Sequence, residues 1–259
     1  MAKPKIIELE EADIVIPILY EDRSVLALDK PAGWMLAPDS WDRTGRNLQL
    51  ALQSSMNAGD FWAHSRNLKY LRFVHRLDAE TTGINLFAKS SGALRAYSEL
   101  FEGRRIEKYY LAVVQGVPKD RDWVCRLPVA PDLGVKGRMR TAKNESVHGA
   151  DWKDAETHFR VLESSKELSL VEARPLTGRT HQIRLHLAAA GHPVVNDPLY
   201  GSGRLAESKG RQRLALRAVR LVYRDPFQNR RVFIEAPTAD FLREFDFTQS
   251  KETGPQQTA

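Results

Sequence analysis

A polar turn at residues 74–83 (VHRLDAETTG) is the first place in this 259-residue sequence where side chains could do chemistry. It places Asp78 among other polar groups, directly before the apolar stretch Ile84–Ala88. Turns mounted on a rigid scaffold often carry catalytic groups. The alternative is a structural turn in which the Asp78 carboxylate caps nearby backbone N–H groups. The turn is therefore a candidate catalytic segment with a structural alternative.

Residues 174–184 (RPLTGRTHQIR) lead into a predicted helix and carry the second candidate group. With 3.6 residues per turn, Ile183 and Leu187 share an apolar face, whereas His181 and Arg184 share another. Arginine is costly to bury without a partner, so an inward-facing Arg184 needs a carboxylate. The alternative is that Arg184 lies in solvent.

The third candidate is the predicted strand Lys108–Val113 (KYYLAV). A tyrosine that enters a strand usually belongs to the core or its rim, but its ring could also be a surface on which a nucleic-acid base stacks. Strand alternation puts Tyr109 and Tyr110 on opposite faces of the sheet, so only one of them can face a given site.

Two other chemistries fit these residues less well. A metal site could draw on His181, His186, His192 and Asp197, but the first two are five residues apart, about 140° around a helix. They do not converge as the histidines of a His-Glu-x-x-His site do. A serine hydrolase needs a Gly-x-Ser-x-Gly turn, and only Gly201–Gly203 (GSG) is present, in a basic stretch. We therefore predict no metal site.

Short strands with a few helices surround these segments. We predict the strands Ser24–Asp29, Ile84–Ala88 and Tyr110–Gln115, a pair of Thr157–Leu162 with Leu168–Arg174, and a pair of Leu214–Tyr223 with Val232–Glu235. We predict the helices Asn47–Met56, Gly92–Phe101 with Ser91 as N-cap and Gly103 as stop, and His181–Ala190. Residues 136–154 are expected to form a long loop or irregular hairpin. The absence of a regular βαβ rhythm indicates an α+β fold with a largely antiparallel sheet.

The composition is that of an ordinary globular protein, with 42% hydrophobic and 28% charged residues, which excludes disorder of the whole chain. Cys125 is the single cysteine, so the chain suits a reducing cytoplasm. The sequence predicts no signal peptide and no membrane span, because the N-terminus has no apolar core region and the apolar runs are too short. We expect an N-terminal extension over residues 1–14, frayed up to Ala12, one domain over 15–247, and a disordered tail over 248–259.

Positive charge is concentrated between Arg204 and Arg231, where nine Lys and Arg residues stand against Glu207 and Asp225. Such a stretch suits a polyanion such as RNA. The alternative is a solvated strand face. If the stretch follows a strand, alternation puts Arg217 on one side and Arg220 on the other.

Taken together, these segments resemble the RluA-type RNA pseudouridine synthases. Residues 75–83 resemble the family's His-Arg-Leu-Asp signature, and residues 30–33 (KPAG) resemble its Lys-Pro-x-Gly turn. Residues 108–113, 177–184 and 191–201 resemble three later blocks in the family's order. The resemblance extends over roughly residues 15–237. The chain departs from the family at Ala37-Pro38, where His-Pro is usual, and at Arg217, where His is common.

The resemblance implies a single α+β domain with a mixed, mainly antiparallel sheet and a central active-site cleft. It also implies catalytic roles for Asp78, Tyr110 as the ring near the target base, and Arg184 as the ion-pair partner of Asp78. The substrate-binding positions that it implies are Arg76 at the flipped-out nucleotide, and His75, Lys108, Arg179, His181 and Arg217.

The implied reaction turns a uridine of rRNA or tRNA into pseudouridine. It needs no cofactor, because no redox change or external group is involved. Asp78 acts either as a nucleophile at C1′ or as a base at C2′. We expect a monomeric cytoplasmic enzyme whose partner is RNA. The alternatives are a catalytically silent RNA-binding module on the same fold and, disfavoured by the histidine spacing, a metal-dependent nuclease.

Overall fold

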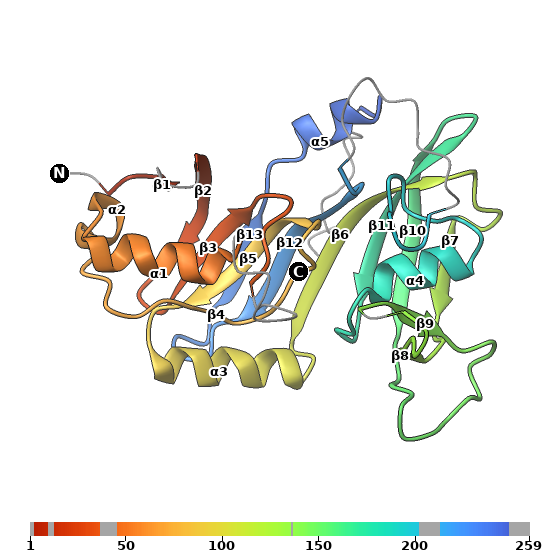
Figure 1. Ribbon diagram of the computed structural model, residues 1–259, viewed down its shortest axis with the longest axis horizontal. Helices are drawn as coiled ribbons and strands as arrows, with labels where there is room; N and C mark the ends of the chain where they lie inside the picture. Colours follow the sequence, from red (N-terminus) through yellow and green to blue (C-terminus); the bar gives the residue numbers. More distant parts are fainter. Residues whose placement is uncertain (1–2, 10–12, 37–45, 136, 202–212, 249–259) are drawn as a thin grey trace.

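A long mixed sheet crosses the whole molecule in the computed structural model, which describes residues 3–9, 13–36, 46–135, 137–201 and 213–248. Its 11 strands follow the order β1-β2-β3-β5-β12-β6-β11-β10-β7, with β13 beside β12 and β4 beside β5 (Figure 1). Within the described ranges, β5 and β12 form the parallel pair and the other pairs are antiparallel. The strands are β1 (Ile6–Leu9), β2 (Ile14–Glu21), β3 (Val25–Lys30), β4 (Arg72–Phe73), β5 (Thr82–Ala88), β6 (Ile106–Gln115), β7 (Asp122–Cys125), β10 (Thr157–Ser164), β11 (Leu168–Pro175), β12 (Leu216–Arg224) and β13 (Arg231–Glu235).

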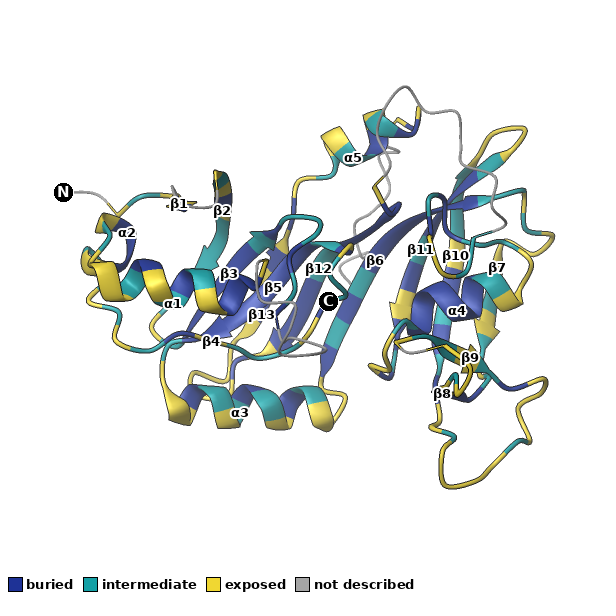
Figure 2. Cartoon of the chain, viewed as in Figure 1, coloured by how far each residue is buried: buried dark blue, intermediate teal, exposed yellow. Residues whose placement is uncertain are grey.

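The helices cover both faces of this sheet. Val25 and Ala27 of β3 belong to the core under α3 (Ser91–Glu102), whereas Leu26 and Leu28 belong to the core under α1 (Leu48–Ala58). Because neighbouring strand residues point to opposite faces, α1 and α3 lie on opposite sides of the sheet. Figure 2 shows the buried strands between them. The short α2 (Phe61–His64) follows α1, and α5 (Ala239–Glu244) follows β13.

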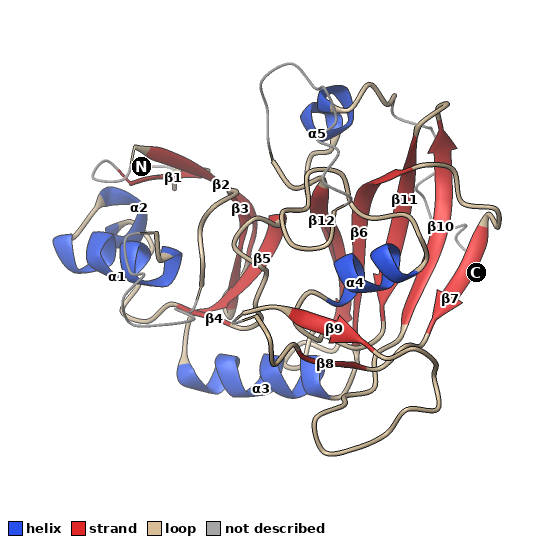
Figure 3. Cartoon of the chain, turned by 45° about the vertical axis from the view of Figure 1, so that its right-hand side comes forward, coloured by secondary structure: helices blue, strands red, loops and turns tan. Residues whose placement is uncertain are grey.

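The other half of the sheet carries α4 (Gln182–Ala189), which lies against β10 and β11 (Figure 3). The alternative that Arg184 lies in solvent is wrong, since Gln182, Arg184 and His186 are as buried as Ile183 and Leu187. Each of these polar side chains has partners: His186, for example, lies 3.0 Å from the Thr157 hydroxyl and 2.9 Å from the Leu127 carbonyl. A helix buried on nearly every side positions its polar groups firmly.

The predicted elements are largely confirmed. The pairs β10–β11 and β12–β13 form as expected, and α3 ends at Gly103. Its N-cap is Ser90, one residue before the expected Ser91, and the Ser90 hydroxyl accepts the Ala93 N–H at 3.1 Å. The expected long loop begins with a small hairpin of β8 (Val129–Pro131) and β9 (Met139–Thr141). In the parts of the chain that the structure describes, none of the helices has the length and apolar character to span a membrane.

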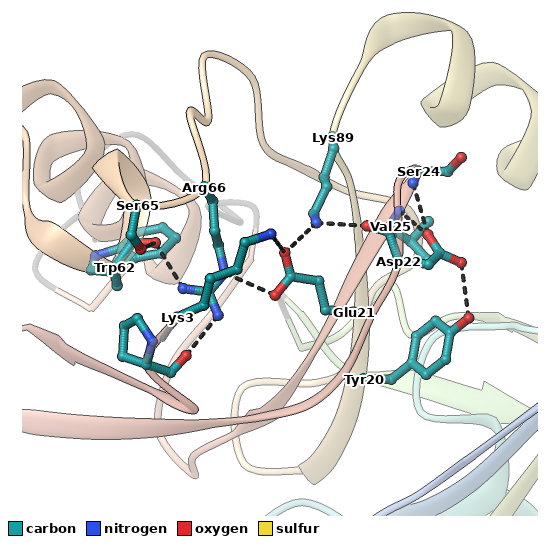
Figure 4. Close-up of polar contacts among 11 residues, drawn as sticks. Lys3, Tyr20, Glu21, Asp22, Ser24, Val25, Trp62, Ser65, Arg66 and Lys89 are labelled. Carbon is teal, nitrogen blue, oxygen red and sulfur yellow. Dashed lines mark hydrogen bonds and ion pairs between the residues drawn. The ribbon is translucent and has the colours of Figure 1, made fainter. Parts of the chain in front are cut away.

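The N-terminus is the main correction to the expected architecture. Residues 6–9 are not frayed but form β1, which pairs with β2 and buries Ile7 and Leu9 in the core under α1. An ion network beside it, shown in Figure 4, centres on Glu21. Its carboxylate accepts hydrogen bonds from Lys89 at 2.6 Å and Arg66 at 2.9 Å, and Lys3 lies 3.5 Å away. Arg66 also donates to the Pro4 carbonyl at 2.6 Å, so the network fastens the N-terminal segment.

The two halves of the sheet meet where β12 enters between β5 and β6. Gly83 of β5 has φ +104°, and a Cβ there would lie 2.1 Å from the Ala218 carbonyl oxygen of β12. Only glycine allows this close approach of the two backbones. The joint matters for the site because the turn that carries Asp78 leads directly into β5.

Candidate active site

Eight of the nine site residues predicted from the sequence line one open cavity of about 610 Å³ between the two halves of the sheet. The turn before β5 supplies His75, Arg76 and Asp78, and β6 supplies Lys108 and Tyr110. The segment that enters α4 supplies Arg179, His181 and Arg184. The ninth residue, Arg217, does not line this cavity. The cavity is called the cleft below.

Arg184 joins the two sides of the cleft. Its Nη1 donates to Asp78 Oδ2 at 3.2 Å, and its Nε and Nη2 donate to the two carboxylate oxygens of Asp197 at 2.7 Å each. The side chain of Arg184 is 4% exposed. Burial alone would lower the pKa of Arg184, but the bond to Asp197 and the charge of Asp78 raise it above the ordinary value. Arg184 is therefore a permanent cation. Two carboxylates, Asp78 and Asp197, supply the partner that a buried arginine requires.

Asp197 is the most informative residue that the sequence reasoning missed, since it entered only as a possible metal ligand. It accepts the backbone N–H groups of Leu199 at 2.9 Å and Tyr200 at 3.1 Å as well as the Arg184 guanidinium. Burial opposes ionisation of Asp197, but Arg184 and these N–H groups lower its pKa. The signal that could have found it is its place in the Asp-Pro-Leu-Tyr-Gly block at residues 197–201.

The two oxygens of Asp78 are in different environments. Oδ2 faces Arg184 at 3.2 Å and His181 Nε2 at 4.0 Å. Within the described part of the chain, no group donates a hydrogen bond to Oδ1, and the side chain is 23% exposed. The described partner of the Asp78 carboxylate is thus Arg184, not the backbone N–H groups of its own turn that the capping alternative required. One carboxylate oxygen is held and the other is accessible to a ligand.

Tyr110 and Tyr109 lie on opposite faces of β6, as strand alternation predicts. Tyr110 is 8% exposed and lines the cleft. Burial and then the negative charge of Asp78 raise its pKa far above the ordinary value, so its hydroxyl stays protonated. On the other face, the Tyr109 hydroxyl donates to Glu107 at 2.7 Å and its ring lies 4.1 Å below the guanidinium of Arg220. Of the two tyrosines, Tyr110 is the one that offers a ring and a proton to a ligand in the cleft.

The cleft wall beside Tyr110 is basic. Lys108 donates to the Thr177 carbonyl at 3.0 Å, and burial, followed by the charges of Arg104 and Arg179, lowers its pKa to about 8. Arg104, which sequence reasoning missed, also lines the cleft, together with Arg76. A cavity with this excess of cations suits an anionic ligand.

His75 belongs to the wall in a different way. Its ring stacks on Phe101 at 4.5 Å, and its Nε2 accepts the backbone N–H of Leu86 at 3.2 Å. Burial, followed by the charge of Lys108, lowers its pKa to about 3. His75 is therefore a neutral side chain with one ring nitrogen already used for structure.

Lys30, in the Lys-Pro-x-Gly turn, was given no role by the sequence reasoning. Its ammonium is fully buried and donates to the carbonyls of Pro31 at 2.9 Å, Ala79 at 2.7 Å and Thr81 at 2.9 Å. Burial lowers the pKa of Lys30 to about 7, against the charges of Glu80 and Asp78. The bonds to Ala79 and Thr81 hold the backbone that follows Asp78. The motif itself was the available signal.

Arg217 lies at the joint of the sheet. Its guanidinium makes two bonds to Asp29, of 3.0 and 2.7 Å, and donates to the Pro237 carbonyl at 3.0 Å. A bulge between Ala218 and Arg220 places Arg217 opposite Leu111 and Arg220 opposite Tyr109. Both therefore face away from Tyr110, and the expectation that they lie on opposite sides is wrong. The extra residue of a bulge reverses the alternation that a regular strand would have.

The basic stretch is only partly described, because Arg204, Lys209 and Arg211 lie outside the described residues. Four of the described arginines have acidic partners: Arg217 pairs with Asp29, Arg220 with Glu172 at 3.4 Å, Arg230 with Asp22 at 3.9 Å, and Arg231 with Glu107 at 3.7 Å. This pairing favours the alternative of a charged strand face over a track for RNA phosphates.

Comparisons with known proteins agree on one family. The sequence profile described as RNA pseudouridylate synthase matches residues 24–189. The chain is 34% identical to a ribosomal large subunit pseudouridine synthase C of Vibrio cholerae, over 93% of this chain and 70% of that protein. It is also 34% identical to an uncharacterized RNA pseudouridine synthase of Bacillus subtilis, over 88% and 72%. A solved structure, human RNA pseudouridylate synthase domain containing 1, superposes with a TM-score of 0.66 at 28% identity, covering 86% of this chain and 83% of that one.

Proposed function

Because the chain belongs to the RNA pseudouridylate synthase family, we propose that Asp78 is the residue with which it isomerises uridine in RNA. The chain is an isomerase that acts on RNA. The observation that supports Asp78 is its pairing with Arg184 at 3.2 Å, with one carboxylate oxygen left accessible in a basic cleft. An ionised, oriented carboxylate beside a site for an anionic polymer is what the reaction requires.

The chemistry breaks the N1–C1′ bond and joins C5 of the turned base to C1′; C5 then loses its proton, N1 gains one, and the Asp78 carboxylate is regenerated. As a nucleophile, Asp78 gives an electron pair to C1′ while the pair of the N1–C1′ bond leaves with the base. As a base, Asp78 takes the C2′ proton, and the pair of the C2′–H bond forms a C1′–C2′ double bond as the base leaves. In both routes the Arg184 guanidinium holds and orients the Asp78 carboxylate, and Tyr110 presents its ring and hydroxyl to the detached base.

The target uridine must leave its stack to reach Asp78. The cationic groups that line the cleft, Arg76, Arg104, Lys108 and Arg179, are suited to the phosphates beside the flipped nucleotide. We assign His75 to the wall that shapes the cleft and His181 to the surroundings of Asp78. Arg217 is assigned to the joint of the sheet, because its guanidinium is already committed to Asp29 and Pro237.

The substrate that we propose is ribosomal RNA of the large subunit, with tRNA as the second candidate. The support is the similarity to the ribosomal large subunit pseudouridine synthase C of Vibrio cholerae, which matches over most of both chains. We propose that the protein acts in the cytoplasm as a monomer, since Asp78, Tyr110 and Arg184 come from one chain and line one cleft. A map of pseudouridine in total RNA from cells with and without the protein identifies the target; loss of a tRNA site instead of an rRNA site would reject the first candidate.

The first prediction concerns the Asp78→Asn variant. The amide keeps the shape of the carboxylate but can neither attack C1′ nor take a proton, so single-turnover pseudouridine formation should fall below about one per cent of wild type. RNA affinity should stay within a few-fold. Both are measured with the same RNA, in the presence of EDTA, because the proposed reaction needs no metal or cofactor. Activity of Asp78→Asn above that level would reject the proposal. So would a requirement for a divalent ion that is not explained by an effect of the ion on RNA folding.

A further inference from the structure

Tyr200 contacts both groups that face Asp78. Its ring lies 5.2 Å below the guanidinium of Arg184, and its hydroxyl lies 2.8 Å from Nδ1 of His181. Tyr200 follows Asp197 in the same turn, and Asp197 holds the other edge of the guanidinium. Nothing in the proposed reaction uses Tyr200 directly, so its contacts need their own explanation.

The hydroxyl of Tyr200 is placed to donate its hydrogen to the His181 imidazole. A phenol has one hydrogen to donate. The backbone N–H of Met139 donates to the Tyr200 oxygen at 2.9 Å, so this oxygen already serves as an acceptor. Among the described residues, the acceptor within reach of its own hydrogen is His181 Nδ1. An imidazole that accepts at Nδ1 carries its proton on Nε2, and Nε2 is the nitrogen that faces Asp78 Oδ2 at 4.0 Å.

His181 is also held in an unusual backbone conformation. It has φ +57° and ψ +15°, a left-handed backbone conformation that residues other than glycine adopt rarely. It directly precedes α4, and its carbonyl accepts the N–H of Leu185 at 2.9 Å. The strained backbone aims the ring at the cleft, and Tyr200 then sets which nitrogen donates there.

From these contacts we infer that Tyr200 is a positioning residue that directs the His181 Nε2–H to Asp78 Oδ2, so that Oδ1 is the oxygen that meets the ribose. The inference rests on the proposed function of Asp78. Arg184 Nη1 and His181 Nε2 converge on the same oxygen, and a movement of about 1 Å brings the second of them to hydrogen-bond distance. With Oδ2 held by two donors, the carboxylate cannot turn, and the lone pairs of Oδ1 stay available for C1′ or for the C2′ proton.

The test is a double-mutant cycle between Tyr200→Phe and His181→Gln, with His181→Phe for comparison. Glutamine supplies an N–H donor and has no tautomers for Tyr200 to fix. We expect Tyr200→Phe and His181→Phe each to lower kcat by about 10- to 100-fold, which corresponds to one hydrogen bond to a charged group. The RNA Kd should change less than about threefold. His181→Gln should be about tenfold more active than His181→Phe, and adding Tyr200→Phe to His181→Gln should change kcat by less than about twofold.

Tyr109→Phe is the matched control, since it removes a tyrosine hydroxyl from the opposite face of the sheet. Thermal unfolding of every variant separates catalysis from stability. Equal losses of kcat from Tyr200→Phe in the wild-type and His181→Gln backgrounds would overturn the inference, as would a loss confined to stability or RNA affinity. If Asp78→Asn remains active, the proposed function fails; if Asp78→Asn is inactive while Tyr200→Phe keeps full activity, only this inference fails.

Discussion

Two carboxylates of this molecule, Glu21 and Asp78, are shielded to nearly the same degree, with 18% and 23% of their side chains exposed. Glu21 has three cations around it: Lys89 and Lys3 at Oε1, and Arg66 at Oε2. Among the described residues, the cation that pairs with Asp78 is Arg184, which it shares with Asp197, and this pairing engages Oδ2 and leaves Oδ1 without a donor. The difference between them is therefore in how many oxygens are occupied, not in burial.

This difference distinguishes a carboxylate that fastens the fold from one that can react. Cations that contact both oxygens of Glu21 leave neither oxygen without a partner, and they join β2, the α2–β4 connection and the N-terminal segment. At Asp78 the guanidinium satisfies only one oxygen, because its other edge is committed to Asp197. Asp197 thus keeps Arg184 from closing on Asp78 with two bonds.

Among the variants that test this comparison, Asp197→Asn has the largest expected effect, because it makes the surroundings of Asp78 resemble those of Glu21. Asp197→Asn removes the second carboxylate, so Arg184 is free to turn and occupy both oxygens of Asp78. A misplacement of about 1 Å at the reacting group costs about 100-fold in turnover, and we expect a loss of this order. Single-turnover pseudouridine formation measures it, with RNA affinity as the comparison. Glu172→Gln, which removes the partner of Arg220 on the other side of β6, is the control; equal effects of the two variants would contradict the role given to Asp197.

The next prediction compares the two tyrosines of β6. Tyr110→Phe keeps the ring in the cleft and removes the neutral hydroxyl beside Asp78, so turnover should fall by about 100-fold if this hydroxyl moves a proton. Tyr109→Phe removes a hydroxyl bound to Glu107 on the other face and should stay within about twofold of wild type. Parallel kcat and Kd measurements on the two variants decide it. A larger loss in Tyr109→Phe would mean that the wrong face of β6 has been assigned to the substrate.

The third prediction tests whether Glu21 is purely structural. Glu21→Gln should leave kcat and RNA affinity unchanged and lower the free energy of unfolding by about 2 kcal/mol, as expected for hydrogen bonds to charged groups. Denaturant unfolding measures this loss. A drop in turnover with unchanged stability would remove the distinction drawn here.

The pH dependence of the same variant sharpens the result. Burial opposes ionisation of Glu21, but the bonds and charges of Lys89 and Arg66 lower its pKa below the ordinary value. Its contribution to stability is therefore complete above the unfolded pKa of about 4.3 and disappears as the pH falls through the folded pKa. The difference in unfolding free energy between wild type and Glu21→Gln should be constant near neutral pH and shrink in acid.

Local motifs predicted much of the cleft. The residues 75–83, 108–113 and 177–184 each contain their candidate side chains within a few positions of a turn or strand, so pattern and resemblance were sufficient to bring Asp78, Tyr110 and Arg184 together in one predicted cleft. The two predicted strand pairs were also correct, because each pair is joined by a short turn.

Partners that depend on distant pairing were not predictable in this way. Arg217 meets Asp29 across 188 positions of sequence, and nothing near either residue indicates the other. The bulge after Ala218 reverses strand alternation without a glycine or proline to mark it. Asp197 was considered only as a member of a disfavoured metal site, and the structure places it against Arg184. The strand β1 was missed because a short edge strand shows little periodicity.

The place of β12 in the sheet has a consequence for how the protein is made. Strands β5 and β6 follow each other in sequence with only α3 between them, yet β12 lies between them in space. During synthesis their facing edges stay unpaired until Leu216–Arg224 has emerged, and such open edges are sites of mispairing. Asp78, Tyr110 and Arg184 are all synthesised before the strand that sets the spacing between them, so the cleft is assembled only after Leu216–Arg224 has been made.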